Sequence, residues 1–222
     1  MTTSQKLLAE FIGSVILSGV VIGSGILALA LADGNHAVAL IGNTIATGAV
    51  LWVIVATMAP VSGAHFNPAV TLAFLLRGQV SLTLAVGFVV VQVIGCLAGA
   101  VLAHAMFELP LIQTATTERS GLAKVLSEAV ATFMLVFAIF GALRHVPRAV
   151  PAAVALTIVA GYWWTASTSF ANPAITMARA FSDTFAGVRP QDVSGFLAGQ
   201  LIGAMLATLI ARLIFGPGDK SA

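Results

Sequence analysis

Charged side chains are scarce in this sequence. Of its 222 residues, only 8% are Asp, Glu, Lys or Arg, whereas 59% are hydrophobic and the mean hydropathy is +1.04. A typical soluble domain carries about 25% charged residues, so these few charges cannot cover a water-facing surface. The composition excludes an ordinary soluble enzyme and a disordered chain, and it predicts a protein that lies within a membrane.

The sequence also lacks a basic cluster and a second cysteine. Ten Lys and Arg against eight Asp and Glu give a net charge of +2 without any basic run, so we expect no nucleic-acid partner. Cys96 alone permits no internal disulfide and no cysteine metal cluster. The four histidines are scattered without metal-ligand spacing. We therefore expect no metal, no cofactor and no enzymatic activity.

Long charge-free windows are the main feature that is present. A spanning helix needs about 20 residues, so the chain has room for about six spans with short connections. The first window follows Lys6 but is longer than the roughly 7–15 apolar residues of a secretory signal, and we interpret it as a retained helix. The fifth window is too long for one helix. The windows are 11–32, 37–64, 80–107, 129–143, 149–178 and 193–211.

Basic residues in the loops indicate the orientation. Cytoplasmic loops carry an excess of Lys and Arg, and six spans place both termini on the same side. That side holds Lys6, Arg77, Arg144, Arg148, Arg212 and Lys220, and the other holds Arg119, Lys124, Arg179 and Arg189. We predict a multi-pass protein of the inner (plasma) membrane with both termini in the cytoplasm.

The two halves of the chain repeat one pattern. Glu10 and Glu128 open the first span of each half, an Asn-Pro-Ala tripeptide follows, and Gln-x-Ile-Gly occurs later at 92–95 and 200–203. Each half has three spans, an odd number, so the second copy enters the membrane inverted. Inverted repeats with a site at the midplane are a transport architecture. We predict one membrane channel domain, 1–222, built from a first repeat, 1–110, and an inverted second repeat, 120–222.

Each Asn-Pro-Ala copy predicts the start of a short helix, because Asn is a good N-cap and Pro favours the first helical position. We expect these helices to run from Pro68 to about Leu76 and from Pro173 to about Phe181. Both are too short to span a bilayer. Irregular backbone at membrane depth is tolerated only inside protein or beside a water-filled cavity, so the two helices should dip in from opposite faces and meet. The residues at this meeting point are Asn67, Pro68, Ala69, Asn172, Pro173 and Ala174.

The predicted meeting point favours neutral solutes. Each helix N-terminus carries roughly half a positive elementary charge, so two of them repel cations, protonated water included. The side-chain amides of Asn67 and Asn172 can donate hydrogen bonds into the lumen. A water molecule whose oxygen accepts these bonds cannot relay a proton through them, so we expect a pore for small neutral molecules.

These motifs resemble the aquaporin (major intrinsic protein) family over nearly the whole chain. The resemblance rests on the two Asn-Pro-Ala copies, the preceding His65-Phe66, the opening Ala9-Glu10-Phe11 and the Gln-x-Ile-Gly repeats. It implies an all-α membrane protein of six tilted transmembrane helices and two re-entrant half-helices, assembled as a homotetramer with one pore per subunit. It also implies passive flux of water, glycerol or other small neutral solutes, with Glu10 and Glu128 supporting the half-helix loops.

The expected selectivity filter departs from the family's pattern. Most of the family has an Arg directly after the second Asn-Pro-Ala, but this chain has Ile175, and Arg179 lies one turn farther along, too far to reach the same point. Counted without gaps, the family's filter falls on Thr47, Ala160, Ser169 and Ile175. Loss of a guanidinium removes a cation barrier and several donors, so we expect a wider, less polar pore of the glycerol-facilitator type. A register shift of one residue would place Phe170 in the pore instead of Ser169 and restore an aromatic wall.

Other interpretations stay open at the level of sequence. The run from Asn172 to Asp183 is similar to a bacterial subgroup of the family linked to arsenic resistance, which implies neutral metalloid hydroxides or methylated arsenicals as solutes. The alternatives are a strict water channel, a proton-coupled transporter using Glu10 or Glu128, and a structural membrane protein with a silent pore. His65 is a further candidate lumen residue, and we interpret the aromatic cluster 162–164 as membrane belt or subunit packing.

Overall fold

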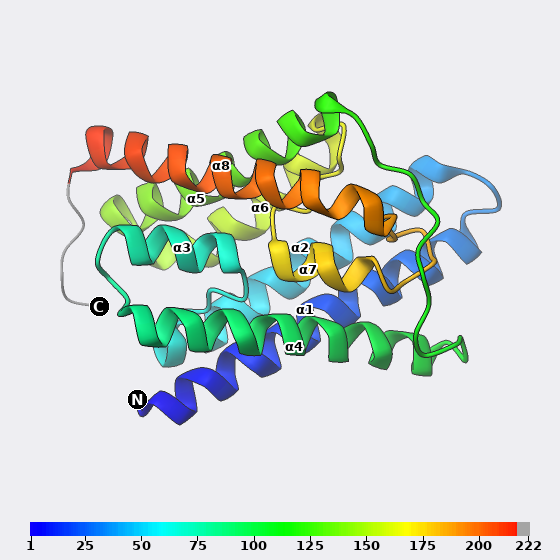
Figure 1. The fold of residues 1–222 in the computed structure, drawn as a ribbon, viewed down its shortest axis with the longest axis horizontal. Helices are drawn as coiled ribbons and strands as arrows, with labels where there is room; N and C mark the ends of the chain where they lie inside the picture. Colours follow the sequence, from blue (N-terminus) through cyan, green and yellow to red (C-terminus); the bar gives the residue numbers. More distant parts are fainter. Residues whose placement is uncertain (217–222) are drawn as a thin grey trace.

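The computed structural model describes residues 1–216, within which all the regular structure is helical; Lys220 of the charge argument lies outside this range. Five helices are long and apolar enough to cross a membrane: α1 (Thr3–Leu31), α2 (His36–Ser62), α4 (Leu82–Met106), α5 (Leu122–His145) and α8 (Pro190–Phe215). Residue 1 and the end of α8 lie at the same end of the bundle (Figure 1). This is the all-α membrane fold that the sequence predicts.

The remaining span, which is the fifth along the chain, is shorter than the other five. It consists of α6 (Val150–Trp164), preceded by the 3₁₀ turn η1 (Pro147–Ala149). The fifth charge-free window continues for 14 residues beyond Trp164 to position 178, but Thr165 turns extended and the helix stops there. The prediction that this window is too long for one helix is confirmed, because its second part forms a loop and a separate short helix.

The two short helices begin where Asn caps them. The Oδ1 atom of Asn67 accepts the backbone N–H of Ala69 at 2.9 Å and starts α3 (Pro68–Leu76). The Oδ1 atom of Asn172 accepts the N–H groups of Ala174 at 3.0 Å and Ile175 at 3.3 Å and starts α7 (Pro173–Arg179). The bounds of α3 agree with the sequence prediction, whereas α7 ends two residues earlier than expected. Figure 1 shows both short helices between α4 and α8.

Glycine allows the long helices to pack backbone to backbone in both halves. A Cβ atom on Gly99 of α4 would lie 2.3 Å from the carbonyl oxygen of Val15 in α1. A Cβ atom on Gly203 of α8 would lie 2.2 Å from the carbonyl oxygen of Ala129 in α5. These contacts are too close for any side chain, so only glycine permits the approach, as is common for membrane helices. The same close contact recurs in equivalent helix pairs and holds each half around its short helix.

Candidate functional site

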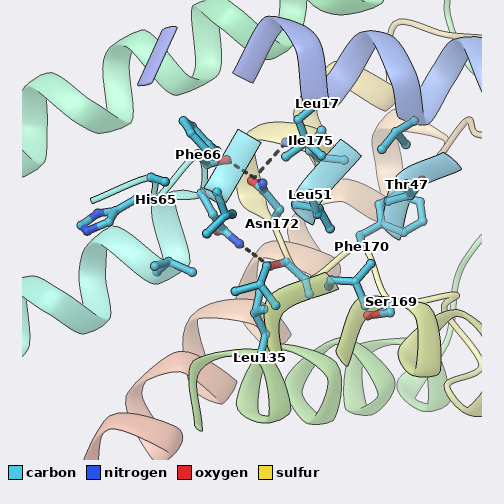
Figure 2. A pocket seen from close by; sticks show the side chains of 18 of the residues that line it. Leu17, Thr47, Leu51, His65, Phe66, Leu135, Ser169, Phe170, Asn172 and Ile175 are labelled. Carbon is cyan, nitrogen blue, oxygen red and sulfur yellow. Dashed lines mark hydrogen bonds between the residues drawn. The ribbon is translucent and has the colours of Figure 1, made fainter. Parts of the chain in front are cut away.

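A cavity lies inside the bundle where the loops before α3 and α7 meet, and Figure 2 shows side chains that line it. About 60 Å³ of it is accessible to water, and its walls come from α1, α2, α3, α5, α6 and α7 and from the loops before α3 and α7. Room for one water needs about 10–15 Å³ measured in this way, so the cavity holds only a few waters or one small solute. We call its two ends the α3 end and the α7 end.

Asn67 and Asn172 lie on the cavity wall and tie the two halves together. The Nδ2 atom of Asn67 donates to the carbonyl oxygen of Ala171 at 2.7 Å, and the Nδ2 atom of Asn172 donates to that of Phe66 at 2.8 Å. Each bond crosses from one half of the chain to the loop of the other (Figure 2). A carboxamide nitrogen has two hydrogens, so each Asn retains one donor for the cavity, while its oxygen is already used as a helix cap.

The loops that precede the two Asn residues adopt an uncommon backbone conformation. Five non-glycine residues have positive φ angles: Ala64 (52°), Phe66 (48°), Thr168 (62°), Ser169 (52°) and Ala171 (48°). Such a conformation costs of order 1–3 kcal/mol per residue and persists only where the surroundings enforce it. The loops therefore need strong external hydrogen bonds.

Glu10 and Glu128 provide those bonds from the spans behind the loops. Glu10 accepts the N–H groups of His65 at 2.9 Å and Phe66 at 2.7 Å. Glu128 accepts the N–H groups of Phe170 at 2.9 Å and Ala171 at 2.8 Å. Both carboxylates are fully buried and neither lines the cavity.

A glutamine completes the same network in each half. The Nε2 atom of Gln92 donates to Glu10 at 2.8 Å and to Thr71 of α3 at 3.0 Å. The Nε2 atom of Gln200 donates to Glu128 at 2.6 Å and to Thr176 of α7 at 2.8 Å. The Gln-x-Ile-Gly repeat therefore joins the carboxylate that holds each loop to the short helix that follows it.

Three of the four predicted filter residues lie on the cavity wall: Thr47, Ser169 and Ile175. Ala160 does not lie there. Its side chain is exposed on the outer side of α6, in a surface groove with Phe133 and Phe137 of α5. The residues of α6 that line the cavity are instead Val154, Ile158 and Tyr162.

Helix periodicity explains the position of Ala160. An α-helix turns by about 100° per residue, so Val154, Ile158 and Tyr162, spaced by four, share one face, and Ala160 lies on the opposite face. Tyr162 contacts the filter position on α2, with its hydroxyl 3.3 Å from that of Thr47. A polar Tyr within an apolar window was the signal in the sequence that pointed to this residue. Of the aromatic cluster 162–164, only Trp163 and Trp164 are exposed, as a membrane belt requires.

Phe170 and Arg179 also lie on the wall at the α7 end. Both Ser169 and Phe170 line the cavity, so the aromatic wall that the alternative register implied is present beside the Ser169 hydroxyl (Figure 2). Sequence spacing places Arg179 too far along α7 to reach the constriction, but in the structure its side chain lines the cavity and is only 2% exposed. Because residues four apart share a helix face, Arg179 follows Ile175 on the same wall.

His65 lies toward the α3 end, near a larger vestibule. Its ring lines the cavity, is 3.1 Å from the hydroxyl of Thr71 through Nδ1, and packs against Phe74 and Phe88. Beyond it, an apolar vestibule of about 550 Å³ shares Val70 and other wall residues with the cavity and has Arg148 among its lining residues. On the α3 side the path thus meets an apolar vestibule, and at the α7 end polar groups of Tyr162, Ser169 and Arg179 lie on its wall.

Comparison with known proteins agrees with this geometry. Residues 1–210 match the family described as Major intrinsic protein. The chain is 47% identical over 214 residues to the aquaglyceroporin AqpS of Rhizobium meliloti, covering 96% of this chain and 91% of that protein. It is 31% identical to the lens fiber major intrinsic protein of Gallus gallus, covering 98% and 84%.

A solved structure shares the fold. The aquaglyceroporin from Plasmodium falciparum superposes with a TM-score of 0.72 at 18% identity, covering 97% of this chain and 98% of that one. The predicted fold class is confirmed, and members of the matching family are channels rather than enzymes. On this sequence match and this shared architecture, the chain belongs to the major intrinsic protein, or aquaporin, family of membrane channels.

Proposed function

We propose that this channel passes glycerol-like polyols, neutral metalloid species such as methylated arsenicals, and water, and that it excludes protons and ions. The observation that carries this proposal is the pair of Asn67 and Asn172 in the cavity wall, each with its oxygen occupied and one N–H left over. The central wall therefore offers amide donors to a passing solute, while each amide oxygen already accepts a backbone N–H of its own short helix.

This arrangement supports proton exclusion. A water molecule at the centre accepts hydrogen bonds from both Asn side chains through its oxygen, so its own hydrogens point away from them. A relay needs each group to accept one proton and release another, and an amide N–H cannot accept. The N-termini of α3 and α7 add partial positive charge at the same place, which disfavours a hydronium ion.

The wall combines hydroxyl groups and hydrocarbon, which supports polyols and methylated solutes. Thr47, Tyr162 and Ser169 contribute the hydroxyl groups, whereas Leu17, Leu51 and Ile175 contribute hydrocarbon. A polyol has hydroxyl groups along a carbon chain, and a methylated arsenical has oxygens opposite methyl groups. The proposed filter is thus Thr47, Tyr162, Ser169 and Ile175, and the 47% identical relative carries the name aquaglyceroporin.

The remaining parts of the proposal concern the oligomeric state, the membrane location and orientation, and the repeat bounds. The exposed groove between α5 and α6, which contains Ala160, is lined by apolar side chains and by Thr157, and it suits lipid or a neighbouring subunit of a homotetramer. We propose an inner-membrane location with both termini cytoplasmic, which makes the α3 end cytoplasmic. The repeat bounds 1–110 and 120–222 are part of the same proposal.

The contacts of the glutamates argue against a proton-coupled transporter. Glu10 and Glu128 lie off the cavity and accept several short bonds each. A proton carrier must exchange with the lumen, and these groups do not reach it. A strict water channel is the remaining alternative. Measuring whether glycerol and a methylated arsenical enter as well as water distinguishes it from the proposed function.

The test is stopped-flow light scattering of proteoliposomes with water, glycerol and a neutral methylated arsenical. We expect entry of all three to exceed that of empty vesicles by about tenfold or more. Water flux without solute entry would mean a strict water channel. Asn172→Asp serves as the pore variant, because it replaces a donor by a negative charge and should admit cations. Unchanged cation exclusion in this variant would remove the central role of the amide.

A further inference from the structure

Arg179 places an unpaired charge in the wall of the cavity. Its Nε atom donates to the carbonyl oxygen of Ala186, and its guanidinium carbon lies 3.3 Å from the centroid of the Phe170 ring. Within residues 1–216, its two terminal nitrogens form no hydrogen bond and no carboxylate pairs with them. The residue is nevertheless only 2% exposed. Because these buried donors lie beside the cavity, they point to a hydrogen bond between Arg179 and a solute in the cavity.

A second guanidinium reaches the same aromatic ring from another part of the chain. Arg119, in the segment before α5, lies with its guanidinium carbon 5.1 Å from the Phe170 centroid. Its Nε donates to Gly187 at 2.8 Å and its Nη2 to Phe185 at 3.3 Å, both backbone carbonyl oxygens. In the described range, Arg119 also forms no side-chain ion pair. Two guanidinium groups lie on one ring, and neither forms a salt bridge within the described residues, so both place positive charge at the α7 end.

The hydroxyl groups beside this charge are also incompletely bonded. Ser169 is 2% exposed, lines the cavity, and has an Oγ atom without a hydrogen-bond partner. Thr47 and Tyr162 contact each other across the same end of the path (Figure 2 labels Thr47, Ser169 and Phe170). A buried polar group without a partner is costly unless water or a ligand satisfies it. Ser169 therefore gives an independent indication that a solute oxygen is bound at this end.

We infer that Arg179, held on Phe170 and reinforced by Arg119, is the cation barrier of this channel and a solute-binding donor at its α7 end. A single charge in a narrow, low-dielectric passage repels cations far more strongly than it does in water. The unpaired Nη atoms can donate to an alcohol, a hydroxide or an oxo group of an uncharged solute. Position 175 is Ile, but the wall still contains a guanidinium, because Arg179 lies one turn farther along α7. This inference rests on the proposed function.

The experiment measures two quantities in the same proteoliposomes. Glycerol entry is followed by light scattering, and the cation leak is followed as proton entry, with a trapped pH-sensitive dye under a potassium diffusion potential. We expect Arg179→Gln to raise the cation leak about tenfold or more and to slow glycerol entry, because this variant loses both the charge and the planar donor. Arg179→Lys should keep the leak low, because it preserves the charge, and should slow glycerol because the planar donor is lost.

The matched control is Arg77→Gln. Arg77 also lies over an aromatic ring, 4.4 Å from the centroid of Phe140, but does not line the cavity. We expect no leak from this control. A second variant, Ile175→Arg combined with Arg179→Gln, should bring the leak back down because it returns a guanidinium to the same helix face.

The outcomes separate this inference from the proposed function. If the unmodified protein passes no glycerol, the proposed function is wrong, whatever the leak. If it passes glycerol and Arg179→Gln leaks no more than Arg77→Gln, only the role of Arg179 is wrong. If Arg179→Gln fails to fold, Arg179→Lys still decides, because a leak in that variant would show that positive charge is not the barrier.

Discussion

Asn67 and Asn172 each perform three tasks with one side chain. The oxygen caps a short helix, one amide hydrogen bonds to the opposite loop, and the other hydrogen remains for the cavity. The capping role follows from local sequence, because the bonded N–H groups are two or three residues away. The cross-bonds join residues 104 and 106 positions apart, and no local pattern predicts such partners.

The proposal that Ile175 is part of the selectivity filter is tested by placing an arginine at this position. Ile175→Arg should reduce glycerol flux about tenfold more than water flux, since an added long side chain narrows the path and water needs less width. The ratio of the two permeabilities by stopped flow is the measurement. Ala160→Leu is the control, because Ala160 faces away from the cavity and should leave the ratio unchanged. Equal losses of water and glycerol in Ile175→Arg would show that Ile175 does not face the solute.

At the scale of elements, the short helices are the best-predicted parts. The sequence predicts both starts and the end of α3, because an Asn cap followed by Pro acts within one turn. The end of α7 differs by two residues because the following segment turns back: Val188 donates to the carbonyl of Arg179 at 3.2 Å, and Ala115 donates to that of Ala180 at 3.0 Å. These are contacts with later and distant parts of the chain, which helix signals do not contain.

Close helix packing makes a prediction for stability. Gly99→Ala should lower the free energy of unfolding by about 1–3 kcal/mol, because the new Cβ would meet the backbone of α1. Thermal unfolding in detergent measures the effect. Gly87→Ala in the same helix is the control, since its nearest neighbour is the movable end of Leu7 at 3.0 Å. A Gly99→Ala protein as stable as the control would mean that α1 and α4 can separate without cost.

At the scale of the whole molecule, the two halves build one path from equivalent parts. Each half contributes a carboxylate, a glutamine, an irregular loop and a short helix, and the cavity exists only where the two sets meet. The ends differ because non-equivalent residues surround them. Arg179 and Tyr162 bring polar groups to the α7 end, whereas mostly small and aliphatic side chains line a vestibule at the α3 end.

A passive pore predicts flux that depends only on the solute gradient. We expect glycerol entry into proteoliposomes to have the same rate with and without a proton gradient of about two pH units, because neither buried glutamate reaches the lumen. Net accumulation against a glycerol gradient, driven by protons, would instead indicate a coupled transporter. Collapse of the gradient by a protonophore provides the control within each preparation.

The sequence by itself determined the membrane class, six spans, the two half-helix starts and the symmetric motifs. These follow from composition and from interactions within a few residues, which a linear pattern contains. Only the tertiary structure decided which side chains share the cavity. It excluded Ala160, placed Ile158, Tyr162 and Phe170 on the wall, and brought Arg179 to a position that spacing alone made remote. The physical reason is that the rotation of α6 and the path of the loop before α7 are set by packing against helices distant in sequence.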